Sequence, residues 1–101
     1  MNKLIRSGIK FYRVQKTDTL KLLSNRFKIP EVVIINDNQL KGEVEVGDML
    51  IINVYNLNIY EVKHLEKIED ICRRFMMTKD EFIKINGIDY LYGGMKVFVK
   101  K

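Results

Sequence analysis

Side chains that commonly carry chemistry are scarce in this sequence. His64 is the only histidine and Cys72 the only cysteine. A metal site built on His64 would need carboxylate ligands as well. The nearest are Glu61, Glu66 and Asp70, which lie on both sides of an expected junction between a strand and a helix. We therefore interpret His64 as a surface residue and predict no metal site.

The remaining reactive groups give an enzyme little support. Cys72 follows Ile71 on the inner side of an expected helix, which favours a buried structural thiol over a nucleophile. A single cysteine excludes an intramolecular disulfide. Gly93-Gly94 leads into an expected strand and not into a helix, so no phosphate-binding loop is present. We predict no catalytic residue and no cofactor.

Four tyrosines are the most interesting of the aromatic residues. They are Tyr55, Tyr60, Tyr90 and Tyr92. Such rings stack on sugars or anchor a protein partner, and they equally often pack in a core or a connecting segment. We keep both interpretations.

Length and composition bound the class of protein. The chain has 101 residues, of which 47% are hydrophobic and 31% charged. This fits one domain or two very small ones. No apolar run approaches the roughly 18 residues of a membrane helix. The first residues lack an apolar core and a cleavage site, so we expect no signal peptide and a protein that is cytoplasmic as synthesised.

The net charge of +5 favours anionic partners such as nucleic acid, anionic lipid or a carboxylate-bearing wall polymer. The cations are scattered, however, and the densest groups are only Arg73-Arg74 and Lys100-Lys101. A nucleic-acid reader more often shows a basic stripe with interleaved aromatic residues. We therefore expect no nucleic-acid partner, and ordinary solubilising surface charge is the simpler interpretation.

The sequence repeats itself when it is shifted by 48 positions. Aromatic, aliphatic, Asn and Gly positions then agree in type and order. The matched pairs are Tyr12 with Tyr60, Val14 with Val62, Leu20 with Ile68, Leu23 with Ile71, Arg26-Phe27 with Arg74-Phe75, Ile34 with Phe82, Asn38 with Asn86 and, after a one-residue deletion, Gly47 with Gly94. We interpret this as two copies of one unit.

Each copy has the pattern of a strand, two helices and a strand. The apolar spacing i, i+3, i+7 of Leu20, Leu23 and Phe27 predicts an amphipathic helix. A second helix opens at Pro30 in one copy and, with capping-box spacing, at Thr78 in the other. The fold class is α+β, with two tandem β-α-α-β units, each a two-stranded antiparallel sheet with two helices packed on one side. The predicted boundaries are an extension at 1–10, units at 11–53 and 59–101, and a partly packed linker at 54–58.

These residues resemble the LysM domain. The segment Tyr12-x-Val14-x-x-Thr17-Asp18-Thr19-Leu20, followed by Asn38, Leu40, Gly47 and Leu50-Ile51-Ile52, is similar to the family's Y-x-V-x-x-G-D-T-L, an Asn-centred loop and G-x-x-L-x-I. The second copy is similar but more divergent, because Leu65-Glu66-Lys67-Ile68 replaces the Gly-Asp-Thr-Leu run.

The resemblance implies binding of a glycan that contains N-acetylglucosamine (GlcNAc), most often peptidoglycan or chitin, in a shallow groove between two loops. Backbone groups at a helix N-terminus would bond the N-acetyl group, and a leucine would contact its methyl. The implied residues of the first copy are Thr17, Asp18, Thr19, Leu20, Asn38, Gln39 and Leu40. Those of the second copy are Glu66, Lys67, Gly87, Ile88 and Tyr90.

Two alternatives stay open. Asp18 and Thr19 equally fit a helix N-cap without a ligand. The whole chain also fits an assembly protein of the spore-coat or phage-tail type, in which LysM-like units hold a protein partner. The resemblance then implies association with a cell wall, a spore or a phage particle, and the alanine-free, Lys-, Ile- and Asn-rich composition indicates a bacterial or phage source.

Overall fold

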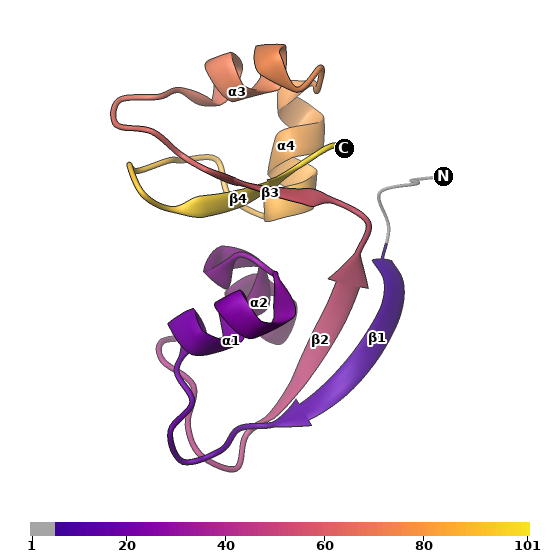
Figure 1. Ribbon diagram of the computed structural model, residues 1–101, viewed down its shortest axis with the longest axis vertical. Coiled ribbons are helices and arrows are strands. Elements are labelled where there is room, and N and C mark those ends of the chain that lie inside the picture. The colour runs from indigo at the N-terminus through magenta and orange to yellow at the C-terminus, as the bar shows by residue number, and fades with distance from the viewer. Residues whose placement is uncertain (1–5) are drawn as a thin grey trace.

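The structure of the protein is a computed structural model that describes residues 6–101. Residues 1–5, the first part of the predicted extension, lie outside the described residues. The described chain forms four helices and two small antiparallel sheets (Figure 1). In order, the elements are β1 (Arg6–Arg13), α1 (Leu20–Phe27), α2 (Glu31–Asn38), β2 (Met49–Tyr55), β3 (Asn58–Glu61), α3 (Ile68–Arg74), α4 (Lys79–Asn86) and β4 (Lys96–Val99). The fold is therefore mixed α and β, and the order strand–helix–helix–strand occurs twice.

The first strand is longer than the sequence pattern indicates. β1 begins at Arg6, within the predicted extension 1–10, and continues without a break past Tyr12. Its first residues pair with the end of β2, where Gly8 lies opposite Val54 in the antiparallel register. The sequence pattern does not indicate this pairing. A half-buried strand is recognised by apolar residues that alternate with exposed polar ones, but Phe11 is apolar and 67% exposed.

Threonine side chains cap the first turns of α1 and α4. Thr19 Oγ1 accepts a hydrogen bond from the backbone N–H of Leu22 at 3.1 Å and so caps α1. At α4, Thr78 Oγ1 accepts from Glu81 N–H at 3.0 Å, while the Glu81 carboxylate accepts from Thr78 N–H at 2.9 Å. The capping box predicted from the sequence is therefore confirmed. Pro30 precedes α2 and supplies no cap oxygen.

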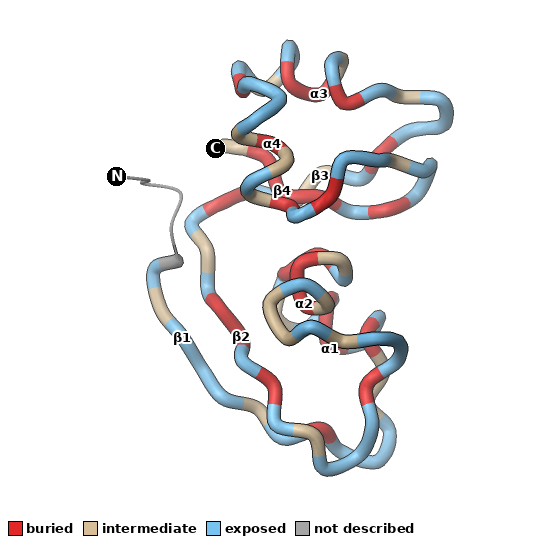
Figure 2. Tube along the Cα trace, turned by 180° about the vertical axis from the view of Figure 1, so that it is seen from behind, coloured by how far each residue is buried: buried red, intermediate tan, exposed pale blue. Residues whose placement is uncertain are grey.

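Buried side chains fall into two clusters, one for each half of the chain (Figure 2). The first cluster comprises Val14, Leu20, Leu23, Ile29, Val33, Ile34, Val44, Leu50, Ile52, Leu57 and Phe98. The second comprises Val62, Ile68, Ile71, Cys72, Met77, Phe82, Ile88, Met95, Val97 and Val99. Some members lie at positions that the 48-residue shift pairs, such as Leu23 with Ile71 and Ile34 with Phe82.

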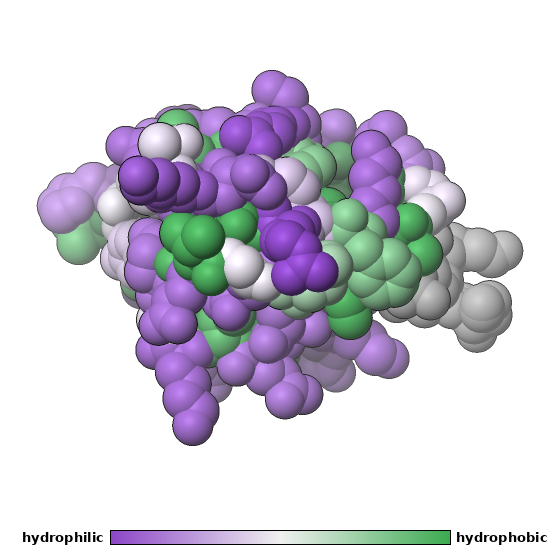
Figure 3. Space-filling view, turned by 90° about the horizontal axis from the view of Figure 1, so that it is seen from below, coloured by the Kyte–Doolittle hydropathy of each residue, from purple (hydrophilic) through white to green (hydrophobic). Residues whose placement is uncertain are grey.

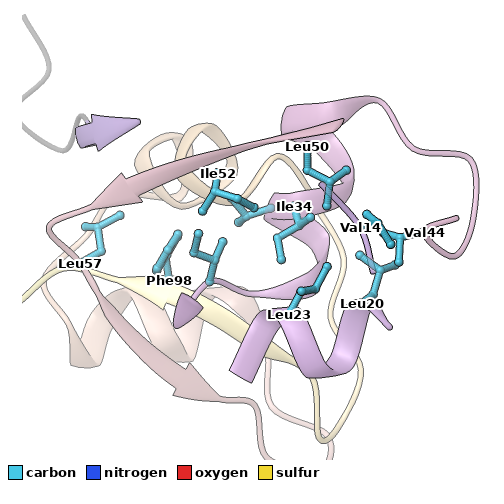
Figure 4. Packing of buried hydrophobic residues seen from close by; sticks show 11 residues of the cluster. Val14, Leu20, Leu23, Ile34, Val44, Leu50, Ile52, Leu57 and Phe98 are labelled. Carbon is cyan, nitrogen blue, oxygen red and sulfur yellow. The ribbon is translucent and has the colours of Figure 1, made fainter. Parts of the chain in front are cut away.

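The two halves pack directly against each other. Phe98 lies on β4, in the second half, yet belongs to the first cluster, near Ile52 and Leu57 (Figure 4). Its ring meets the ring of Tyr55 edge-on, with 5.3 Å between the centroids. The Asn36 side chain on α2 donates hydrogen bonds to the carbonyls of Asn86 at 3.3 Å and Gly87 at 3.1 Å. Burial and polar contacts thus join the halves.

Across residues 6–101, no helix combines the length and the apolar character that crossing a bilayer requires.

Because Phe98 fills the core of the other half, we expect its loss to destabilise the whole described chain. Phe98→Ala should lower the free energy of unfolding by about 3–5 kcal/mol, the usual cost of a large core truncation. Urea unfolding followed by circular dichroism and tyrosine fluorescence measures this. Phe11→Ala is the matched control and should change stability by less than about 0.5 kcal/mol, because that ring is exposed. Two separate transitions in the wild-type protein would contradict the shared core.

Candidate functional site

The two loops predicted to form the first groove lie next to each other and are joined by Glu43. The loop at 14–19 connects β1 to α1, and the loop at 39–48 connects α2 to β2. Glu43 Oε2 accepts hydrogen bonds from Leu20 N–H at 2.6 Å and from Val44 N–H at 3.0 Å. A carboxylate from the second loop therefore lies at the N-terminus of α1, where it is also favoured by the helix dipole.

The first-loop residues have different environments. Thr17 is exposed, Thr19 is partly buried as the cap of α1, and Leu20 is 7% exposed and belongs to the first cluster. Leu20 thus presents little apolar surface to a ligand. Its N–H, which the predicted site needs for the N-acetyl group, donates to Glu43.

Asp18 is engaged by other parts of the protein. Its Oδ2 accepts from the Tyr12 hydroxyl at 2.5 Å and from Gln15 N–H at 2.7 Å, and its Oδ1 lies 3.4 Å from Arg26. The Arg26 guanidinium also donates to the Tyr12 oxygen at 2.9 Å. The Tyr12 hydroxyl and then the Gln15 N–H hold the pKa of Asp18 below its usual value, and Arg26 lowers it further. The Asp18 side chain is only 3% exposed.

The same arrangement recurs in the second half with glutamate in place of aspartate. The Tyr60 hydroxyl donates to the Glu66 carboxylate at 2.8–2.9 Å, and Arg74 lies 3.2 Å from Glu66 and donates to Tyr60 at 2.6 Å. Burial alone would raise the pKa of Glu66, but the Lys63 N–H and the Tyr60 hydroxyl outweigh it, so the pKa is lowered. We call Tyr12–Asp18–Arg26 and Tyr60–Glu66–Arg74 the two tyrosine–acid–arginine clusters.

Asn38 is also bonded within the protein. Its side-chain N–H groups donate to the carbonyls of Ile34 and Ile51, both at 3.0 Å, and its oxygen accepts from Ile51 N–H at 2.7 Å. Asn86 makes the corresponding three bonds to Phe82 and Phe98. Each asparagine thus ties the end of a helix to the neighbouring strand.

The other second-loop residues differ in exposure. Gln39 is exposed and left-handed, with φ 53°, where it ends α2. Leu40 is partly buried against the first cluster, and its N–H donates to the carbonyl of Ile35 at 3.0 Å. Of the three predicted residues of this loop, Gln39 is the exposed one.

In the second half, a surface hollow of about 320 Å³ lies between the corresponding loops. The residues that line it are Glu66, Lys67, Ile68, Glu69, Lys79, Asp89, Tyr90 and Leu91. It brings together three of the predicted residues, Glu66, Lys67 and Tyr90. It does not include the other two, because Gly87 ends α4 and meets Asn36, and Ile88 is buried in the second cluster.

Sequence reasoning missed Glu43 and the roles of the two arginines. One signal for Glu43 was available: α1 has no acidic residue in its first turn, so its N-terminus lacks a local carboxylate. The signal for the arginines was the repeat itself, which aligns Arg26 with Arg74 and Asp18 with Glu66.

The cysteine and the histidine have the burial and exposure that the sequence predicts for them. Cys72 is buried, its Sγ lies 3.6 Å from the Thr78 carbonyl, and burial raises the pKa of its thiol. His64 is exposed. In the part of the chain that the structure describes, no three His, Cys, Asp or Glu side chains gather as a metal site would require.

Comparison with known proteins identifies one part of the chain. Residues 12–53 match the family model of the LysM domain. LysM domains are binding modules, generally for peptidoglycan and other polymers of GlcNAc. The match ends before β3 and does not show a second copy. No curated protein matches the chain.

Two solved structures similar to the chain are those of spore cortex-lytic enzymes named SleL. The enzyme of Bacillus megaterium QM B1551 is 21% identical, with a TM-score of 0.47, over 91% of this chain and 22% of that chain. The enzyme of Bacillus cereus is 23% identical, with a TM-score of 0.44, over 93% of this chain and 23% of that chain. The chain spans less than a quarter of the length of either enzyme.

Asp18 should make stability depend on pH. Because its pKa is lower in the folded than in the unfolded chain, Asp18 stabilises the fold above its unfolded pKa of about 3.9. This contribution disappears as the pH falls through the lower folded pKa. Asp18→Asn should therefore lower the urea midpoint at pH 7, and the difference from wild type should shrink towards pH 2.

Urea midpoints across this pH range measure the effect. Glu45→Gln, a change at an exposed carboxylate, is the control and should leave the midpoint nearly unchanged. An Asp18→Asn deficit of equal size at pH 7 and pH 2 would show that the carboxylate charge is not its cause.

Proposed function

We propose that the protein is a non-catalytic module that binds GlcNAc-containing glycan, in the form of bacterial peptidoglycan, through the loops of its LysM-like segment. The observation that carries the proposal is the LysM match over residues 12–53, which includes both of the adjoining loops. The net charge of +5 suits an anionic wall polymer. Cell-wall or spore association is part of the same proposal.

The groove would be formed by residues 16–20 and 39–44. In it, the N-acetyl carbonyl accepts a hydrogen bond at the N-terminus of α1, where backbone N–H groups point outward. Glu43 already accepts from Leu20 N–H there, so the glycan must displace its carboxylate or bind beside it. Thr17 and Gln39 are exposed on the two sides and supply polar contacts. Asp18 and Asn38 act on the groove by holding the two loops and not by touching sugar.

We further propose that residues 59–101 form a second, divergent LysM unit. Three features support this: the second strand–helix–helix–strand order, the second tyrosine–acid–arginine cluster and the second asparagine tie. Its groove would be the hollow lined by Lys67 and Tyr90. Two linked sites would strengthen binding to a polymer, since the second site engages at high effective concentration.

A second candidate function is an assembly protein that holds a protein partner, of the spore-coat or phage-tail type. The outward face of the β1–β2 sheet favours it. On that face Phe11 lies opposite Ile51, and Met49 and Ile9 are close to half exposed. Figure 3 shows the protein from below, where apolar side chains are also exposed among polar ones. Exposed apolar surface of this kind often marks a protein contact.

The experiment that separates the two functions is a ¹⁵N-HSQC titration with a GlcNAc tetramer, beside a sample given soluble peptidoglycan fragments. Glycan binding predicts shifts at residues 16–20 and 39–44. Shifts at Lys67 and Tyr90 as well would identify the second groove. If millimolar sugar moves none of these amides, glycan binding is wrong and a search for a protein partner follows.

Replacing Glu43 tests how the groove works. Glu43→Ala frees the N–H of Leu20, so we expect the GlcNAc tetramer to bind up to about tenfold tighter, because a competing charged hydrogen bond is worth more than 1 kcal/mol. The variant should also lose about 1 kcal/mol of stability, since the loops lose their link. Isothermal titration calorimetry and urea unfolding measure the two effects. Glu45→Ala is the matched control in the same loop, and weaker binding by Glu43→Ala would instead make Glu43 a ligand residue.

A further inference from the structure

A cleft of about 270 Å³ lies between the two halves, away from both loop grooves. One wall comes from α1 and the start of α2, and the other from the start of β4 and the loop before it. The residues that line it are Lys21, Ser24, Asn25, Glu31, Val32, Tyr92, Gly94, Met95 and Lys96. Figure 1 shows α1 and α2 beneath the second sheet, which is the arrangement that creates this cleft. It exists only because the halves are packed together.

The base of the cleft is apolar and fixed. Met95 is 5% exposed, and Val32 packs against both core clusters. The loop above it is held in place because Tyr92 N–H lies 3.3 Å from the Met95 sulfur. Ser24 adds no free hydroxyl, since its O–H donates to the Ile29 carbonyl at 2.5 Å. A ligand would therefore meet a small preformed apolar surface.

The rim carries two ammonium groups and one aromatic ring. Lys96 Nζ donates to Asn25 Oδ1 at 3.1 Å, which bridges the two walls and leaves further N–H groups of the ammonium for a ligand. Lys21 is exposed on the adjacent face of α1. Tyr92 is 59% exposed. Glu31 is the one carboxylate among the lining residues.

We propose that this cleft binds a single sugar ring that carries a carboxylate, as an acidic amino sugar of a wall glycan does. The carboxylate lies between Lys21 and Lys96, which supply charge-assisted hydrogen bonds. The apolar face of the ring stacks on Tyr92, and an acetyl or lactyl methyl contacts Met95. The proposal rests on the proposed glycan function and adds a third contact, specific for acidic sugar.

The size and charge of the cleft favour this ligand over a neutral oligosaccharide. Its volume is just below the lower end of typical ligand pockets, about 300 Å³, so it fits one substituted ring and not a chain. A neutral sugar would partly desolvate both ammonium groups and leave Glu31 as the one carboxylate among the lining residues to balance two positive charges, which costs binding energy.

The test uses three peptide-free disaccharide probes in ¹⁵N-HSQC titrations of the full chain. The first joins N-acetylglucosamine to N-acetylmuramic acid, the second is the same molecule with its carboxylate amidated, and the third is the neutral GlcNAc dimer. We expect the acidic probe alone to shift the amides of Lys21, Asn25 and Met95. Equal shifts there from the acidic and amidated probes, or none from either, would overturn the proposal.

Variants assign the contacts. Tyr92→Ala should weaken binding of the acidic probe by about fivefold to tenfold, because it removes the stacked ring. Phe11→Ala is the matched control, since Phe11 is similarly exposed but lies on β1 and lines neither the cleft nor the hollow of the second half. Lys21→Gln should reduce binding several-fold and reduce its dependence on salt, whereas Lys84→Gln, exposed on α4, should change neither.

The failure of this proposal is distinguishable from failure of the glycan function. The glycan function is read from the neutral GlcNAc probes at residues 16–20 and 39–44. The cleft is read from the difference between the acidic and amidated probes at Lys21, Asn25 and Met95. Equal effects of Tyr92→Ala and Phe11→Ala on the acidic probe would also count against the cleft.

Discussion

The packing of Phe98 into the first half is the contact on which the rest of the structure depends. Neither strand–helix–helix–strand half exceeds 50 residues, a size at which a hydrophobic core is barely large enough for stability. Phe98 extends the first core with a side chain from β4, and Val32 and Ile85 pack against both clusters. The halves therefore share buried surface, and the cleft between them is a by-product of that contact.

Polar groups then hold the helix ends and loops that the apolar contacts do not fix. The side chains of Asn38 and Asn86 each make three hydrogen bonds that tie a helix end to a strand. The two tyrosine–acid–arginine clusters hold the loop after the first strand of each half. These residues have the types expected of ligand-binding groups, yet their bonding capacity is largely used inside the protein. A polar residue that recurs in a binding family can therefore hold the shape of a loop just as well as it can contact the ligand.

The sequence predicted the helices, the capping box and the buried positions well, because they depend on local spacing. Leu20, Leu23 and Phe27 lie on one helix face, and Thr78 and Glu81 are three residues apart; both signals are complete within a few residues. The extent of β1 was not predicted, since its first residues pair with β2 residues that lie 44–49 positions later.

The candidate site was less predictable for the same reason. Glu43 reaches a helix that begins 23 residues earlier, and the repeat offers no second carboxylate at the corresponding position to draw attention to it. The cleft joins Lys21 to Tyr92 and Lys96, which no pattern within either half connects. Sequence periodicity describes each half separately, whereas contacts between halves depend on how they dock.

The short connection between the halves has a consequence for any polymer that touches both. Only Asn56 and Leu57 separate β2 from β3, Leu57 is buried, and Asn36 bonds across the junction to Gly87. A Cβ atom at position 87 would lie 2.3 Å from the Asn36 side-chain nitrogen, so this junction has no room for a larger residue. Under the proposed glycan function, a polymer that binds both halves would therefore meet two sites at a fixed distance and angle, and the protein would lose little conformational entropy on binding it.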